Sequence, residues 1–140
     1  MDPEALLDLL DAWLPRLRAV AERDADLVVG SKWSRKQLLG HLLDSAQNNY
    51  QRFVRLRRGD LSGFPGYDQE AWVEAGAYGD APWADLVELW RLFNLRLAAV
   101  IRGLPAEAAG HRWQDQDCDL AYLVQDYHRH LVHHLERLQV

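Results

Sequence analysis

The chain contains 140 residues, about half of them apolar and six of them tryptophan, so it can bury one hydrophobic core but not two. Its net charge of −5 argues against nucleic acid and anionic membranes as partners, and no apolar run is long enough to span a bilayer. Because the N-terminus lacks a basic signal-peptide start and the single cysteine cannot form an internal disulfide, we expect one cytoplasmic domain over residues 1–140.

The first predicted helix begins with Asp2 as its N-cap and Pro3 as its first helical residue. Pro15 should kink or split this helix, because proline lacks a backbone donor and clashes with the preceding turn. The helix should bury a stripe of apolar residues at helical spacing, namely Leu6, Leu7, Leu10, Trp13, Leu14, Leu17 and Val20.

The second predicted helix follows Trp33, where Ser34 and Gln37 form a capping box. Its apolar stripe consists of Leu38, Leu42, Ala46, Asn49, Phe53 and Leu56. His41 lies on the flank of this stripe, and the same polar flank continues through Ser45, Asn48 and Arg52. A polar edge beside a core needs partners, which a metal pocket would supply. Asp44, one turn after His41, is either an acceptor that orients an imidazole or a solvated carboxylate.

An arginine cluster ends this helix: Arg52, Arg55, Arg57 and Arg58. It either complements the helix dipole in solvent or attracts an anionic substrate group. The long connection from Gly59 to Gly79 contains a short helix from about Asp68, and we expect substrate discrimination here. Its aromatic residues either form a lid over the core or line a pocket: Phe64, Tyr67, Trp72 and Tyr78.

A third long helix follows Pro82 and stops at Gly103 and Pro105. Its expected stripe consists of Leu86, Leu89, Trp90, Phe93, Leu97, Val100 and Ile101. No strand-like alternation is found anywhere in the chain. Cys118 lies in a polar turn before the last helix with no basic residue close in sequence, so we expect no nucleophilic role for it.

The last predicted helix has an apolar stripe of Leu120, Leu123, Val124, Tyr127, Leu131, Leu135 and Leu138. His134 falls inside this stripe and His130 lies at its edge one turn earlier, so both rings project toward the same partner helix. His133 points to solvent, and His128 flanks the other edge, so both are excluded as ligands. His130 and His134, together with His41, form a candidate three-imidazole metal site across two helices.

Three neutral imidazoles without a fourth protein ligand match the open coordination of a catalytic metal. The alternative is a solvated, histidine-rich helix in which His134 is a hydrogen-bonded core residue. No Glu or second Asp lies one turn from the predicted ligands on the inward face, so the sequence indicates no general base. Tyr127 is a weak candidate for a proton donor that we expect to pack in the core, and Asn48 or Arg52 would orient substrate.

The chain resembles the DinB-like superfamily of small helical proteins, close to its YfiT-like branch. The resemblance rests on four segments: Trp33-Ser34, residues 37–45 (Gln-Leu-Leu-Gly-His-Leu-Leu-Asp-Ser), residues 67–72 (Tyr-Asp-Gln-Glu-Ala-Trp) and Tyr127 with residues 130–135 (His-Leu-Val-His-His-Leu). The resemblance implies an all-α, antiparallel four-helix bundle with a long crossover that carries a short helix. It also implies that His41, His130 and His134 bind one divalent metal.

The resemblance further implies a metal-dependent hydrolase or a transferase that uses a low-molecular-weight thiol such as bacillithiol. Both chemistries use a metal-activated nucleophile, water or thiolate, that attacks a small electrophile. Of the two nucleophiles, we favour the thiol slightly over water. The alternatives are a non-catalytic metal-binding stress protein and, ranked last, a structural module with surface histidines. Imidazole suits zinc, nickel, copper and iron, of which we expect zinc or nickel. We expect a small-molecule substrate and a homodimer.

Overall fold

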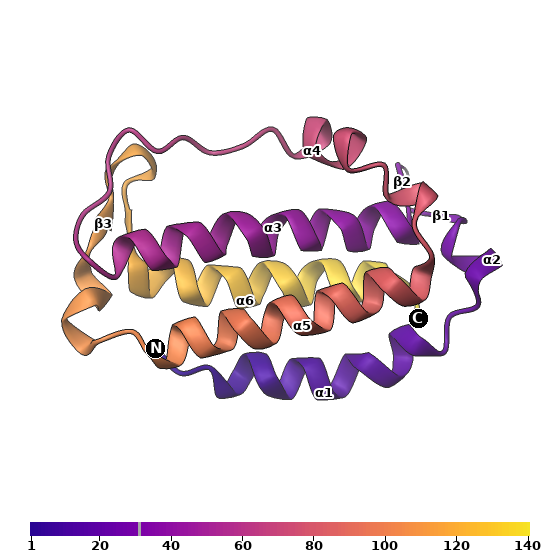
Figure 1. The fold of residues 1–140 in the computed structure, drawn as a ribbon, viewed down its shortest axis with the longest axis horizontal. Coiled ribbons are helices and arrows are strands. Elements are labelled where there is room, and N and C mark those ends of the chain that lie inside the picture. Colours follow the sequence, from indigo (N-terminus) through magenta and orange to yellow (C-terminus); the bar gives the residue numbers. More distant parts are fainter. Residues whose placement is uncertain (31) are drawn as a thin grey trace.

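The computed structural model describes residues 1–30 and 32–140, and its framework is four long helices (Figure 1). These are α1 (Glu4–Arg18), α3 (Arg35–Leu56), α5 (Trp83–Arg102) and α6 (Leu120–Arg137). Helices α3 and α1 each pack against both α5 and α6, so the four form a closed ring around one core. The predicted all-α four-helix bundle is confirmed. No helix of the described residues is long and apolar enough to cross a membrane.

The connection from α3 to α5 returns along the whole bundle, so α3 and α5 run in the same direction (Figure 1). Helices α1 and α6 run the opposite way, which leaves each helix with one antiparallel neighbour, α1 with α5 and α3 with α6. The predicted crossover helix is present as α4 (Gln69–Gly76), which Asp68 caps and which packs against α3. A single 3-10 turn, η1 (Tyr78–Asp80), follows it.

The remaining elements are short. They are α2 (Glu22–Ala25), β1 (Val28–Val29), β2 (Trp33–Ser34), η2 (Ala106–Gly110), β3 (Arg112–Trp113), η3 (Gln114–Gln116) and β4 (Cys118–Asp119). Strands β1 and β2 form one antiparallel hairpin, and β3 and β4 form another. The expectation of no strands was therefore wrong for these segments, because two residues are too few to give a period-two signal. The second hairpin also contacts the crossover at Leu61.

The helix ends follow the predicted capping chemistry. Both hydrogen bonds of the Ser34–Gln37 capping box form at the start of α3. At the start of α1, the Asp2 carboxylate accepts the Glu4 amide and Pro3 already has helical dihedrals. Pro15 lies three residues before the end of α1, which is not split there. Proline is tolerated at this place because only one exposed carbonyl of the preceding turn loses its partner.

The core is built from the predicted stripes, of which Leu7, Val20, Phe93 and Val100 are partly buried and Leu89 is exposed. All seven residues of the stripe on α6 are buried, and so are the six on α3. On α5, Leu89 is 48 % exposed, so its assignment to the stripe was wrong. The helix buries Val87 instead, because α5 packs against both α1 and α3 and its buried face is centred on Trp90. Trp83, at the start of α5, donates its indole N–H to the Leu17 carbonyl at 2.7 Å and joins this core to α1.

Candidate metal centre

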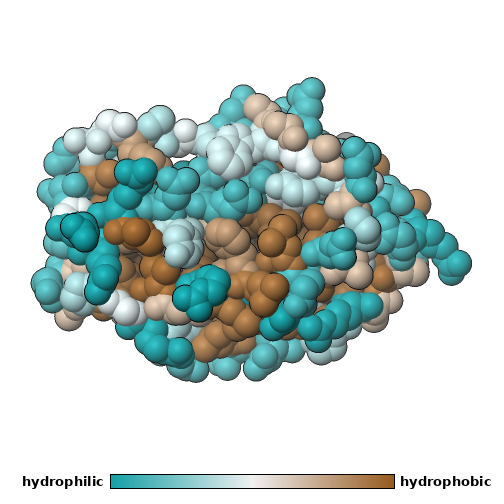
Figure 2. Space-filling view, viewed as in Figure 1, coloured by the Kyte–Doolittle hydropathy of each residue, from teal (hydrophilic) through white to brown (hydrophobic). Residues whose placement is uncertain are grey.

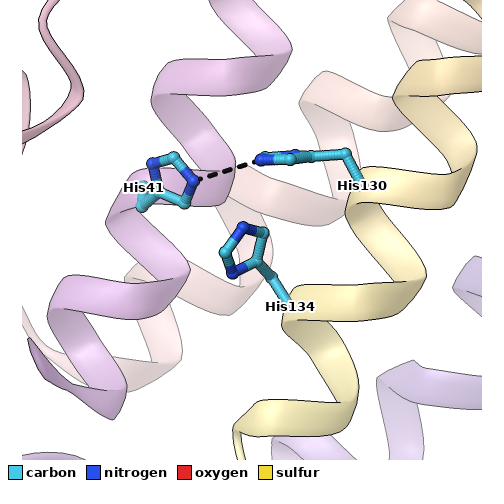
Figure 3. A group of neighbouring side chains, drawn as sticks. All are labelled: His41, His130 and His134. Carbon is cyan, nitrogen blue, oxygen red and sulfur yellow. Dashed lines mark hydrogen bonds between the residues drawn. The ribbon is translucent and has the colours of Figure 1, made fainter. Parts of the chain in front are cut away.

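Three histidines from two helices converge on one point between α3 and α6 (Figure 3). His41 projects from α3, and His130 and His134 project from successive turns of α6. One ring nitrogen of each lies within 4.8 Å of the others. His41 is fully buried, whereas His130 and His134 are half-buried. His133 is exposed, as its position in the helix predicts, and its ring lies beside that of His134 with the centroids 5.1 Å apart.

The distances and the donor set fit a divalent metal ion. The Nε2 atoms of His41 and His130 face each other at 3.4 Å. Two nitrogens bound to one tetrahedral zinc at about 2.0–2.1 Å would lie about 3.3–3.4 Å apart. The Nδ1 atoms of His41 and His134 are buried and have no hydrogen-bond partner among the described residues. The three histidines therefore form a cluster that could bind a metal.

The surroundings keep these histidines neutral, which is the form that donates to a metal. Burial, together with the neighbouring His130 and Lys32, lowers the pKa of His41 to about 4. Burial, together with His130 and His41, lowers the pKa of His134 to about 3. Burial also lowers the pKa of His130, although the Asp126 carboxylate opposes this shift. All three rings are therefore unprotonated at neutral pH.

No fourth protein ligand joins the group among residues 1–30 and 32–140. His130 instead lines a cavity of about 390 Å³ beside the cluster. The cavity is open to solvent and lies between α3 and α6, flanked by the crossover and the second hairpin. Its wall consists of Ser45, Asn49, Arg52, Gly66, Tyr67, Gln69, Trp113, Gln116, Cys118, Tyr122, Leu123, Asp126, Tyr127 and His130. A metal bound by the histidines would therefore keep an open coordination position facing the cavity, where a small molecule fits.

The other predicted site residues take different places. Arg52 lies in the cavity wall, whereas Asn48 lies outside it and donates to the Asp44 carbonyl at 2.8 Å. Asp44 is buried and accepts a hydrogen bond from the Tyr78 hydroxyl, not from an imidazole. The interpretation as a solvated carboxylate was therefore wrong, and burial raises the pKa of Asp44. The Tyr127 hydroxyl is buried and donates to Asn94 Oδ1 at 2.5 Å.

Sequence reasoning missed two parts of the cavity wall. Asp126 lies on α6 exactly one turn before His130, so the statement that no second acid lies there was wrong. The spacing of four residues was the available signal, but Asp126 falls on the hydrophilic edge of the helix. Trp113 comes from β3, which had no sequence signal. Cys118 also faces the cavity, and burial raises the pKa of its thiol, while Arg112 and Arg52 oppose this shift.

The crossover aromatics divide between the two predicted roles. Tyr67 lines the cavity. Phe64 packs against Trp113 with ring centroids 6.5 Å apart. Trp72 is partly exposed and packs one side of its ring against Tyr67, with centroids 5.2 Å apart. Tyr78 packs over α3, where the absence of a side chain at Gly40 makes room for its ring.

Comparison with known proteins agrees with this fold. No curated protein matches the chain significantly. Among solved structures, the chain is similar to YfiT from Bacillus subtilis, described as a probable metal-dependent hydrolase with an unusual four-helix bundle topology. The two share 22 % sequence identity with a TM-score of 0.84, over 98 % of this chain and 81 % of that one. The family model of the DinB superfamily matches residues 5–138. The chain therefore belongs to the DinB superfamily.

Proposed function

We propose that His41, His130 and His134 hold one divalent metal ion, zinc or nickel, in an enzyme that acts on a small electrophile. The metal would lower the pKa of a bound water molecule or thiol, so that hydroxide or thiolate is available at neutral pH. The observation that carries the proposal is a three-histidine cluster that lies beside a cavity and has no fourth protein ligand among the described residues. A structural site would be closed by a fourth ligand.

The residues of the chain have separate roles in this proposal. The burial of the three imidazoles keeps them neutral, so no proton competes strongly for their lone pairs near pH 7. His130 lies in the cavity wall, so a molecule bound in the cavity would lie next to the metal. Asp126 is the acid nearest to His130 along α6, and we assign it the proton transfer that accompanies attack.

Two nucleophiles remain as candidates for the reaction. The similarity to YfiT, described as a probable hydrolase, favours water. The resemblance to the bacillithiol-using branch favours a low-molecular-weight thiol, which we place slightly ahead. Either nucleophile would use the same ligands and the same cavity.

The first test is metal content. The metal-free protein is loaded in turn with zinc, nickel, manganese and iron, and bound metal is measured by elemental analysis. We expect about one metal per chain in the wild type and a loss in both His41→Ala and His134→Ala. His133→Ala is the matched control, because His133 lies on the same helix but outside the cluster. Absence of metal in the wild type, or retention in both cluster variants, would contradict the site.

The second test is turnover by the metal-loaded protein on small electrophiles with and without added thiol. Turnover that requires both metal and thiol supports the transferase, and turnover with metal alone supports the hydrolase. Stoichiometric metal without turnover in either condition would replace the enzyme with a non-catalytic metal-binding protein. Asp126→Asn should retain the metal and lower kcat by roughly 10²-fold or more if Asp126 transfers the proton.

A further inference from the structure

Arg52 is a buried cation that has no acidic partner in the part of the chain that the structure describes. It is 9 % exposed, and no carboxylate forms an ion pair with it among the described residues. Its Nη1 donates to Asn49 Oδ1 at 3.5 Å, and its buried Nε has no hydrogen-bond partner in the described part of the chain. Burial lowers the pKa of the guanidinium, but arginine stays charged at neutral pH. Buried charges are normally paired, because desolvation is costly.

The guanidinium is held by aromatic faces and not by acids. Its carbon lies 4.3 Å from the centroid of the Trp113 ring and 5.8 Å from that of Tyr67. Trp113 is itself fixed, because its indole N–H donates to the Phe64 carbonyl at 2.7 Å. Stacking on a ring stabilises the cation while the N–H edges of the guanidinium stay free to donate. Helix α3, the crossover and the second hairpin together therefore hold Arg52 in place.

Arg52 and the histidine cluster occupy different ends of the cavity. The part of α6 that lines it, from Tyr122 to His130, spans about 12 Å of helix. Arg52 follows His41 by eleven residues on α3, roughly 16 Å along the axis, and its guanidinium lies against Trp113 of the second hairpin. Asp126 is only one turn from His130. The cavity therefore has an acid near the metal cluster and a cation at the far end.

We propose that this cavity binds an elongated small molecule whose carboxylate pairs with Arg52 while its reactive end reaches the metal cluster at His130. The planar guanidinium matches a carboxylate in geometry, and one positive charge balances one carboxylate. A phosphate dianion would leave a buried negative charge without compensation. The inference rests on the proposed function for the reaction, but the binding step needs no metal. The carboxylate belongs either to the thiol or to the electrophile.

The test compares hexanoate with hexanamide, which have the same length but differ in charge, by ligand-observed NMR titration. The protein is first freed of metal on a chelating resin, because soluble chelators carry carboxylates of their own. We expect hexanoate to bind at least about tenfold more tightly than hexanamide. Arg52→Gln should abolish this preference. Arg55→Gln is the matched control and should keep it, because Arg55 lies one turn away on α3, stacks on Phe64 and is outside the cavity.

A second measurement keeps the test valid if Arg52→Gln does not fold. In the wild type, hexanoate should shift the indole N–H signal of Trp113 and leave those of Trp13 and Trp90 in place. Equal binding of hexanoate and hexanamide, or an unmoved Trp113 signal, would overturn the proposal. Tighter binding of butyl phosphate than of hexanoate would overturn the choice of a carboxylate.

The use of metal-free protein separates this inference from the metal proposal. Because hexanoate is tested on metal-free protein, a failure of metal binding leaves the carboxylate result intact, and the reverse also holds. In turnover assays of the metal-loaded protein, Arg52→Gln should raise KM at least about tenfold for whichever substrate carries the carboxylate. An unchanged KM for both the thiol and the electrophile would contradict a role of Arg52 in substrate binding.

Discussion

The protonation of the histidine cluster links the site to the stability of the metal-free protein. Folding lowers the pKa of His41 to about 4 and that of His134 to about 3, from 6.5. At pH values between these folded-state pKa values and 6.5, the unfolded chain binds more protons than the folded chain, so acid favours unfolding. The free energy of unfolding should fall by on the order of 1 kcal/mol for each of these two residues between about pH 7.5 and 5.5. Urea unfolding of metal-free protein at several pH values measures this loss.

Single substitutions identify the source of this pH dependence. His134→Gln should reduce the loss of stability at acidic pH, because a side chain that does not titrate replaces the buried imidazole. His133→Gln should reduce the loss of stability much less, because His133 is exposed and contributes less than burial, His130 and His41 to the lowered pKa of His134. A wild-type protein whose stability is flat over this range would show that the cluster is solvated. Loading with a metal should make the pH dependence steeper, because protons compete with the metal for the same nitrogens.

At the scale of single residues, the sequence predicted the cluster better than the cavity. His130 and His134 could be paired from helical spacing, and His41 from its place beside an apolar stripe. Their convergence needed only that α3 and α6 pack together. The burial of Arg52 depends on Trp113, sixty-one residues away in a hairpin of two-residue strands. Local periodicity contains no information on such a contact, and by itself it favours solvent for an arginine.

At the scale of elements, the packing of η1 over α3 gives a prediction about Gly40. A Cβ at this position would overlap the Tyr78 ring, whose hydroxyl donates to Asp44 on the same helix. Gly40→Ala should therefore destabilise the protein by about 1–3 kcal/mol of overpacking, reduced by up to about 1 kcal/mol of gained helix propensity. Chemical denaturation of the two proteins at neutral pH measures the difference.

The cause can be checked with a second substitution in the same pair. In a Tyr78→Ala background the overlap is gone, so Gly40→Ala should become neutral or stabilising. Gly79→Ala is the control within η1, because a Cβ there meets nothing within 4 Å. Equal destabilisation by Gly40→Ala in both backgrounds would show that Tyr78 is not the obstacle.

The elements differ in how well the sequence determined them. Helix α3 could be predicted to its first residue, because Ser34 and Gln37 satisfy backbone donors that any helix start leaves open. Helix α5 ends at Arg102, next to Gly103 and shortly before Pro105, as these two residues predict. The buried face of α5 could be predicted only in part, since Leu89 has the right spacing but lies beyond the reach of α1 and α3. Which neighbours a helix has is decided by the whole fold.

At the scale of the whole molecule, apolar surface gathers over α5, which lies at the front of the view in Figure 2. Leu89, Leu92 and Leu95 are exposed there, and Leu92 is 46 % exposed. Exposed apolar patches of this kind mark association surfaces. We expect a homodimer through this face, and Leu92→Glu should convert it to a monomer in light scattering coupled to gel filtration. Leu27→Glu, at an exposed leucine away from α5, is the control. A monomeric wild type, or an unchanged dimer in Leu92→Glu, would contradict this expectation.

The order of the helices determines when a metal site can exist during synthesis. The imidazoles of His41 and His130 face each other although 89 positions separate them in the chain. A ribosome that adds 5–20 residues per second needs roughly 5–20 s to pass from the first to the second. During that interval the nascent chain contains only one imidazole of the cluster, that of His41. Metal acquisition therefore belongs to the finished polypeptide, after α6 has left the exit tunnel and closed the ring.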